Sequence, residues 1–182
     1  MSTLWIVLII AAVIILYVIY VFNSMITLKN RVQNSWGQID VQLKRRYDLI
    51  PNLVETVKGY AKHEKETLDM VTKARAGLMK GGMQERAKAS DMITNALKSL
   101  FAVAESYPDL KANQNFLMLQ EELAGTESKI AYARQFYNDM VMKFNTKLEK
   151  FPTNMVGKML NFASKEYFKT EGVEREAVKV KF

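Results

Sequence analysis

The sequence predicts an all-α membrane protein in which an N-terminal transmembrane helix continues into an elongated antiparallel helical bundle. Three observations support this prediction: an uncharged apolar run near the N-terminus, apolar residues that recur at three- and four-residue steps along most of the chain, and only 8 Gly and 3 Pro in 182 residues. A β-sandwich would need many more turns than so few Gly and Pro indicate. We therefore divide the chain into a transmembrane anchor (1–22), a helical bundle (23–168) and a C-terminal tail (169–182).

The anchor is the run Leu4–Phe22, which contains no charged side chain, no Gly, no Pro and no amide. As a helix its 19 residues would be about 28 Å long, close to the ~30 Å hydrocarbon core of a bilayer. A signal peptide would have a basic start and a small-residue cleavage site, and both are missing. Aromatic residues stand near both ends, where the membrane interface favours them, and an alanine pair lies at the centre. The residues with these roles are Leu4, Trp5, Ala11, Ala12, Tyr17, Tyr20 and Phe22.

Positive charge is distributed unevenly around the anchor. Lys29 and Arg31 follow it closely, whereas no charged side chain precedes it. Cytoplasmic flanks of membrane helices carry an excess of Lys and Arg. We therefore expect a single-pass protein of the cell (inner, or cytoplasmic) membrane, with its N-terminus outside and residues 23–182 in the cytoplasm.

The first long helix is predicted from Asn23 to Lys80, because apolar residues continue at helical steps from Met25 to Leu78. Pro51 interrupts this pattern, and a proline inside a helix removes a hydrogen bond and costs about 3 kcal/mol. The apolar steps do not slip at the proline, so we favour one helix kinked there. The alternative is a helix that ends near Asp48 and a second that begins at Pro51.

Two short turns divide the middle of the chain. Lys80-Gly81-Gly82 is a typical helix end, with a cation followed by glycine, so a second helix is expected over 83–105. Ser106-Tyr107-Pro108-Asp109 forms the next turn, because Pro108 disfavours helix at the residue before it. Short connections make consecutive helices antiparallel neighbours.

The last long helix is predicted over 110–150 and ends at Phe151-Pro152-Thr153. A short apolar helix is expected over 154–168, where it caps the bundle. The alternative for this segment is an interfacial helix lying on a membrane. We interpret the tail as a mobile segment, or as a strand that pairs only in an oligomer or with a client.

Polar residues beside the apolar stripes are expected to set the register of the bundle, because buried polar groups need partners. Glu127 and Arg134 are seven residues apart on one helix, and we expect them to contact charges on other helices, with Asp40, Arg45 and Arg75 as candidates. Lys44-Arg45-Arg46 is expected to be a solvated face, with Arg45 or Arg46 folding onto Asp48 or Asp40; the alternative is a phosphate or lipid contact. The residues assigned structural or interaction roles are Trp36, Asp40, Arg45, Arg46, Asp48, Pro51, Arg75, Gln120, Glu127, Arg134 and Asn138.

Two stretches of the chain resemble a known protein family. Residues 34–64 read NSWGQIDVQLKRRYDLIPNLVETVKGYAKHE, and residues 115–139 read NFLMLQEELAGTESKIAYARQFYND. Both are similar to signatures of the LemA family, and the resemblance extends over about residues 23–168. It implies a single-pass membrane protein with an all-helical bundle. It implies no catalytic residue, because the family has none established that could be transferred to this chain.

The composition narrows the function further. The chain has no Cys and a single His, His63, and the residue four positions later is Thr67, so the zinc-protease pattern HExxH is missing. We predict no enzyme activity, no metal, no cofactor and no nucleic-acid partner. The predicted function is a membrane-anchored helical scaffold or interaction protein that associates with the bilayer, with copies of itself and with other membrane proteins. The alternative is a basic lipid-surface-binding or membrane-shaping module, in keeping with the net charge of +7.

Overall fold

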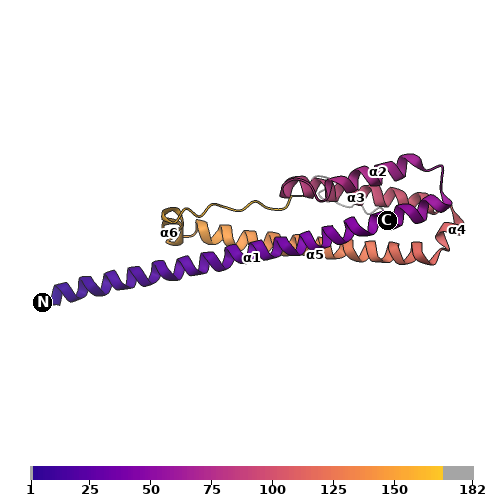
Figure 1. Cartoon of the computed structure of the whole chain (residues 1–182). Coiled ribbons are helices and arrows are strands. Elements are labelled where there is room, and N and C mark those ends of the chain that lie inside the picture. The colour runs from indigo at the N-terminus through magenta and orange to yellow at the C-terminus, as the bar shows by residue number, and fades with distance from the viewer. Residues whose placement is uncertain (1, 170–182) are drawn as a thin grey trace, which may run out of the picture. The chain divides into compact units, whose positions relative to one another are not determined.

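The computed structural model describes residues 2–169 and, within them, contains helices and no strand, so the predicted all-α class is confirmed (Figure 1). The described residues form two compact units. The anchor unit comprises 2–37 and 135–167, and the bundle unit comprises 38–134 and 168–169. Our prediction for the tail at 170–182 lies outside the described residues. The helices are α1 (Ser2–Tyr60), α2 (Lys65–Gly77), α3 (Met83–Ala104), α4 (Pro108–Lys111), α5 (Gln114–Glu149) and α6 (Thr153–Met159).

Helix α1 is continuous from Ser2 to Tyr60 and therefore passes through Pro51. The alternative of two helices that meet at Pro51 is wrong. The expected extension to Lys80 is also wrong, because the helix ends at Tyr60 and α2 begins only at Lys65. The Tyr107 hydroxyl lies 2.9 Å from the Glu64 carboxylate and donates a hydrogen bond to it, which fixes the turn between the two helices.

The membrane-spanning prediction rests on the first part of α1. Among the described residues, α1 is the one helix long and apolar enough to cross a bilayer, with a mean hydropathy of 3.1 over its most apolar window. Large apolar side chains from Leu4 to Leu16 are exposed. The first buried side chains of α1 are those of Val21 and Met25.

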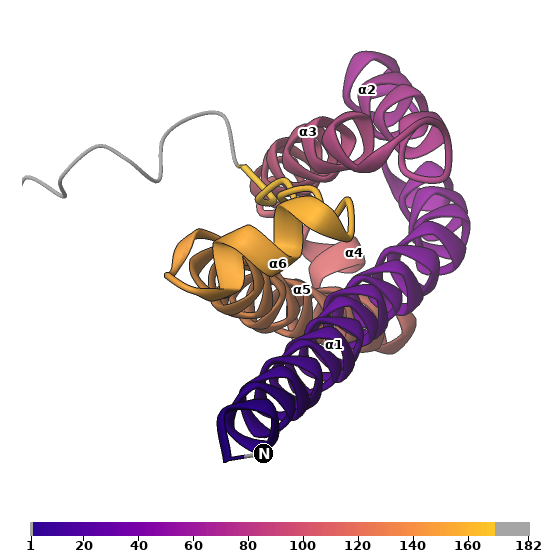
Figure 2. The ribbon, with the colours of Figure 1, turned by 90° about the vertical axis from the view of Figure 1, so that its left-hand side faces the viewer.

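The bundle unit contains α2, α3, α4 and the adjoining parts of α1 and α5. Helices α2 and α3 pack side by side, as both ribbon views show (Figures 1 and 2). The predicted turn after α2 is confirmed, with Gly81 at a φ of 77°, a value that glycine adopts without strain. The predicted helix at 110–150 is divided into α4 and α5. Asn113 lies between them, and its side-chain oxygen accepts a hydrogen bond from the Phe116 backbone N–H at 3.0 Å, which caps α5.

In the anchor unit, α6 lies against the end of α5 (Figure 2). A Cβ on Gly157 would come within 2.5 Å of Leu148 Cδ1, so glycine permits this close approach. Helix α6 ends at Met159, and the expected helix up to Phe168 is wrong. Asn161 has a φ of 54° and turns the chain away from the helix.

The segment after α6 is held by polar contacts with α5. The Asn145 side chain donates to the Lys165 carbonyl oxygen at 2.9 Å and accepts from the Lys165 N–H at 2.8 Å. The Phe162 ring packs against Phe22 at 6.2 Å and against Phe144 at 6.4 Å between centroids. These contacts place the segment beside the residues at the end of the apolar run.

Candidate functional site

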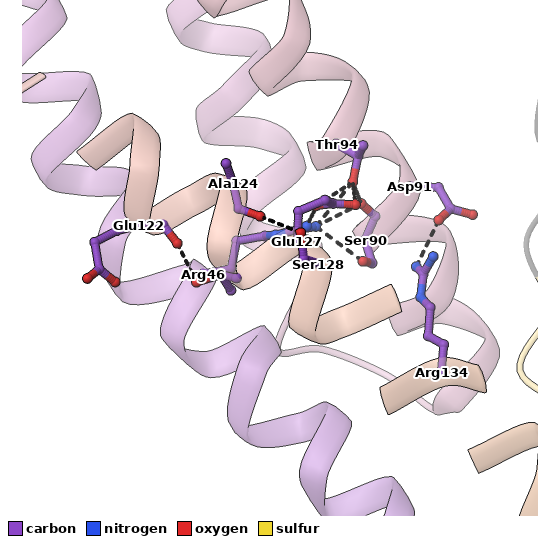
Figure 3. A network of polar contacts seen from close by, with 10 residues as sticks. Arg46, Ser90, Asp91, Thr94, Glu122, Ala124, Glu127, Ser128 and Arg134 are labelled. Carbon is purple, nitrogen blue, oxygen red and sulfur yellow. Dashed lines mark hydrogen bonds and ion pairs between the residues drawn. The ribbon is translucent and has the colours of Figure 1, made fainter. Parts of the chain in front are cut away.

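A buried arginine is the centre of a polar network in the bundle unit (Figure 3). Arg46 lies on α1 with an exposed fraction of 0 %. Its Nη1 donates to Thr94 Oγ1 at 3.2 Å and to the carbonyl and hydroxyl oxygens of Ser90 at 3.3 Å, both on α3. Its Nη2 forms an ion pair with Glu127 of α5. A single side chain thus connects three helices.

The electrostatics of Arg46 follow from this burial. Desolvation lowers the pKa of Arg46 to about 10; the charge of Arg134 acts in the same direction and that of Asp91 opposes it. The guanidinium therefore stays protonated at neutral pH and needs the Glu127 carboxylate as a counter-charge. Thr94 Oγ1, 3.1 Å from Glu127 Oε1, connects the two sides of the ion pair.

A second pair extends the network. Arg134 of α5 donates from Nη2 to Asp91 Oδ1 of α3 at 2.8 Å, and its guanidinium carbon lies 4.5 Å from the centroid of the Phe168 ring. Glu127 and Arg134 therefore each contact a charged residue on another helix, as expected. The partners are not the expected candidates Asp40, Arg45 and Arg75. Glu127 pairs with Arg46, and Arg134 pairs with Asp91.

The residues named as candidate partners are paired elsewhere. Asp40 pairs with Arg86, Arg45 pairs with Glu122, and Arg75 donates to the carbonyl oxygen of Tyr47. Neither Arg45 nor Arg46 folds onto Asp48 or Asp40, and Lys44 pairs with Asp48 at 2.5 Å.

The other residues singled out from the sequence lie on α1 and α5. In the anchor unit, the Trp36 ring lies 5.9 Å from the Tyr137 ring in an edge-on arrangement, and Asn138 is half-buried on α5. Gln120 is half-buried in the bundle unit, and Pro51 is exposed on α1. The Tyr137 hydroxyl donates to the Glu166 carbonyl oxygen at 2.9 Å, and burial raises the pKa of Tyr137 to about 12.

The charged network joins α1, α3 and α5. Arg46 is covered by protein and cannot contact a ligand. In residues 2–169 there is no group of three or more His, Asp or Glu side chains that could hold a metal ion. His63 is exposed in the turn between α1 and α2, so the expectation that it lies within a helix is wrong.

Among the surface grooves of the described residues, two have lining residues from both α1 and α5. In the bundle unit, a groove of about 520 Å³ lies between α1 and α5, and we call it the α1–α5 groove. Its lining residues are Gln38, Val41, Gln42, Gly125, Ser128, Lys129, Tyr132 and Ala133. Val41 and Tyr132 are exposed by 64 % and 72 %, so two apolar side chains face solvent here.

The second groove lies in the anchor unit, and we call it the lysine groove. It has a volume of about 550 Å³. Its lining residues are Tyr17, Met142, Lys143, Thr146, Lys147, Lys150, Phe151, Pro152 and Thr153. Our reading of the sequence missed this site. The spacing of Lys143 and Lys147 on one helix face was the available signal.

This fold, with its long exposed apolar helix, is that of a membrane-associated helical protein. The chain belongs to the LemA family, whose profile matches residues 35–182. It is 31 % identical to Protein LemA of Metamycoplasma hominis, over 88 % of this chain and 75 % of that protein. It is 26 % identical to Magnetosome protein MamQ 2 of Paramagnetospirillum magneticum and 24 % identical to Magnetosome protein MamQ of Magnetospirillum gryphiswaldense. Both alignments cover 81 % of this chain and 64 % of the relative. None of these names describes an enzymatic activity.

Proposed function

We propose that the chain is a membrane-anchored helical scaffold that self-associates through the α1–α5 groove. The observation that carries this proposal is the exposure of Val41 and Tyr132 in a groove whose only charged lining residue is Lys129. Gly125, Ser128 and Ala133 on the α5 side are small and let another helix approach closely.

The anchor favours a second copy as the occupant of this groove. Helices tethered in one membrane have their translation restricted to two dimensions, so the effective concentration of one copy near another rises. A two-fold axis along the membrane normal pairs the same groove on both copies and keeps both anchors parallel. We place the span in the cell membrane with the bundle in the cytoplasm, because Lys29 and Arg31 follow the apolar run.

Cross-linking in intact membranes tests this proposal. The chain has no Cys, so a single cysteine can be introduced without background. Gln38→Cys at the edge of the groove should form a disulfide-linked dimer, and Met118→Cys, on an exposed position of α5 outside the groove, should not. Equal cross-linking of both variants, or of neither, would contradict self-association through this surface.

Charge substitution provides the second arm. Val41→Glu with Tyr132→Glu should convert the oligomer to a monomer in lipid nanodiscs, because two carboxylates would be desolvated at the contact. The matched control is Leu117→Glu with Met118→Glu, which adds the same charge at exposed apolar positions of α5. If the molecular mass of full-length wild-type protein is that of a monomer, scaffolding by self-association is wrong.

A specific observation supports a second function, contact of α6 with the membrane surface. Phe151, Met155 and Met159 are exposed, and Phe162 a few residues later packs on Phe22 at the end of the apolar run. Apolar side chains at such a position can insert into the boundary between headgroups and acyl chains. A fluorophore on Met155→Cys should be quenched by lipids spin-labelled near the top of the acyl chain, whereas one on exposed Met92→Cys in the bundle unit should not.

A further inference from the structure

The lysine groove combines basic side chains with a position next to the apolar span. Lys143 and Lys147 are four residues apart and lie on one face of α5, and Lys150 directly follows Glu149, the last residue of the helix. Lys147 donates to the Ser24 hydroxyl, and its Nζ lies 5.5 Å from the centroid of the Tyr20 ring. Tyr17 completes the groove from the side of α1. The groove is thus built around the last residues of the anchor.

The length of the exposed part of α1 indicates the level at which this groove lies relative to a bilayer. Leu4 to Leu16 amounts to about 20 Å of helix, which is shorter than the ~30 Å hydrocarbon core of a bilayer. The span must therefore include Tyr17 to Phe22, where α5 and the segment after α6 make contact. The end of α5 consequently lies at the level of the lipid headgroups.

The chemistry of the groove matches one component of that layer. Its lining contains three ammonium groups and the hydroxyl groups of Tyr17, Thr146 and Thr153, and it contains no carboxylate. Asp139 and Glu149, also on α5, are not among the lining residues. Lysine side chains can extend their charge along an apolar surface toward phosphate oxygens.

We propose that the lysine groove binds the phosphate of an anionic phospholipid headgroup in the leaflet that adjoins Phe22. This inference deepens the membrane-surface contact proposed for α6 and rests on it. The exposed apolar residues of α6 would hold the surface in the leaflet, whereas the three lysines would select the lipid. The span would then carry a bound lipid on the side that faces α5.

Lipid selectivity of the full-length protein in nanodiscs tests the proposal. A fluorophore on Glu149→Cys reports proximity, and phosphatidylcholine nanodiscs receive a small fraction of spin-labelled phosphatidylglycerol or spin-labelled phosphatidylcholine. The wild-type protein should show a preference for phosphatidylglycerol. Its quenching by the phosphatidylglycerol label should exceed quenching by the phosphatidylcholine label about fivefold or more, as expected for several lysines at an anionic surface. Lys143→Gln with Lys147→Gln and Lys150→Gln should reduce this preference to about onefold.

A matched charge control separates the groove from net charge. Lys58→Gln with Lys62→Gln and Lys65→Gln removes three exposed lysines near the turn between α1 and α2 and should keep the preference. An equal loss in this control, or a preference that survives in the groove variant, would overturn the assignment. Abolition of the preference by millimolar glycerol phosphate at constant ionic strength would show a site for free phosphate and overturn the lipid as its ligand.

The same samples distinguish this inference from the α6 contact. If quenching of the Met155→Cys probe persists in the lysine variant while selectivity is lost, both proposals are supported. If the Met155→Cys probe is not quenched in protein that keeps all three lysines, the proposed contact of α6 with the membrane surface is wrong. A lipid preference that still depended on the three lysines would then support the lysine groove, and only the contact of α6 would be overturned.

Discussion

Arg75 donates a hydrogen bond from Nε to the backbone carbonyl oxygen of Tyr47 at 2.9 Å, and its guanidinium carbon lies 3.7 Å from the centroid of the Tyr47 ring. Pro51 follows Tyr47 by four residues and has no N–H, so α1 itself cannot supply the donor that this carbonyl would receive in a regular helix. Arg75 of α2 supplies a donor in its place. The proline is therefore tolerated inside α1 because a neighbouring helix compensates for it.

The first prediction concerns this compensation. Arg75→Met should lower the free energy of unfolding by about 1–2 kcal/mol, because a hydrogen bond and a cation–π contact are lost. In a Pro51→Ala background the same change should cost less, since an alanine at this position restores the helical N–H donor. Thermal unfolding of the four full-length proteins in detergent, followed by circular dichroism, measures the difference. Strictly additive effects would show that the two residues are not coupled.

The second prediction concerns the ion pair of Arg46 and Glu127. Glu127→Ala leaves a buried guanidinium without its counter-charge, and we expect a loss of about 2 kcal/mol. This loss is smaller than the ~3–5 kcal/mol typical of breaking a fully buried pair, because the Glu127 side chain is 41 % exposed and water can partly replace it. Arg46→Met combined with Glu127→Leu should recover most of the stability. As a control, Glu122→Ala breaks an exposed pair and should cost less than about 1 kcal/mol.

The third prediction concerns the clamp between Asn145 and Lys165. Asn145→Ala removes a donor and an acceptor that hold the segment after α6, which should cost about 2 kcal/mol. Amide hydrogen exchange over 160–167 should accelerate, while exchange in α3 should not change. Glu149→Ala, on the exposed side of the same helix, is the control. Unchanged protection of 160–167 in the Asn145 variant would mean that ring packing alone holds the segment.

The fourth prediction concerns alkaline pH. Tyr137 has a folded-state pKa of about 12, above its ordinary value of 10, so its contribution to stability is complete below pH 10 and is lost as the pH rises through 12. The melting temperature should therefore fall less steeply over this range in Tyr137→Phe than in the wild type. Arg46, whose pKa is lowered, acts in the opposite direction in both proteins and cancels in the comparison.

The periodicity of apolar residues predicted the class of fold because a helix face repeats every three to four residues wherever it meets a core. The same signal failed at the end of α1. Ala61 and Leu68 are both buried, so the apolar steps continue across a turn that lies between two helices. Asn113 was a readable signal for the start of α5, since asparagine is a preferred capping residue, but the apolar stripe concealed it.

The partners of the charged residues could not be predicted in the same way. A turn of α3 by one residue would rotate Ser90, Asp91 and Thr94 by about 100° and exchange the side chains that meet Arg46 and Arg134. Such a choice depends on how the helices pack and not on spacing along one helix. The end of α6 likewise depends on contacts with α5, which are distant in sequence.

The unbroken course of α1 has a consequence for the span itself. Tyr20 and Phe22, at the end of the apolar run, and Ser24, just after it, contact α5 and the segment after α6. Where α1 spans a bilayer, these contacts set the azimuth of the span, with one side turned toward protein and the other toward acyl chains. One alanine inserted after Leu16 would turn everything before it by about 100°, whereas seven would bring it back nearly into phase. The orientation of the anchor about its own axis is thus part of the structure.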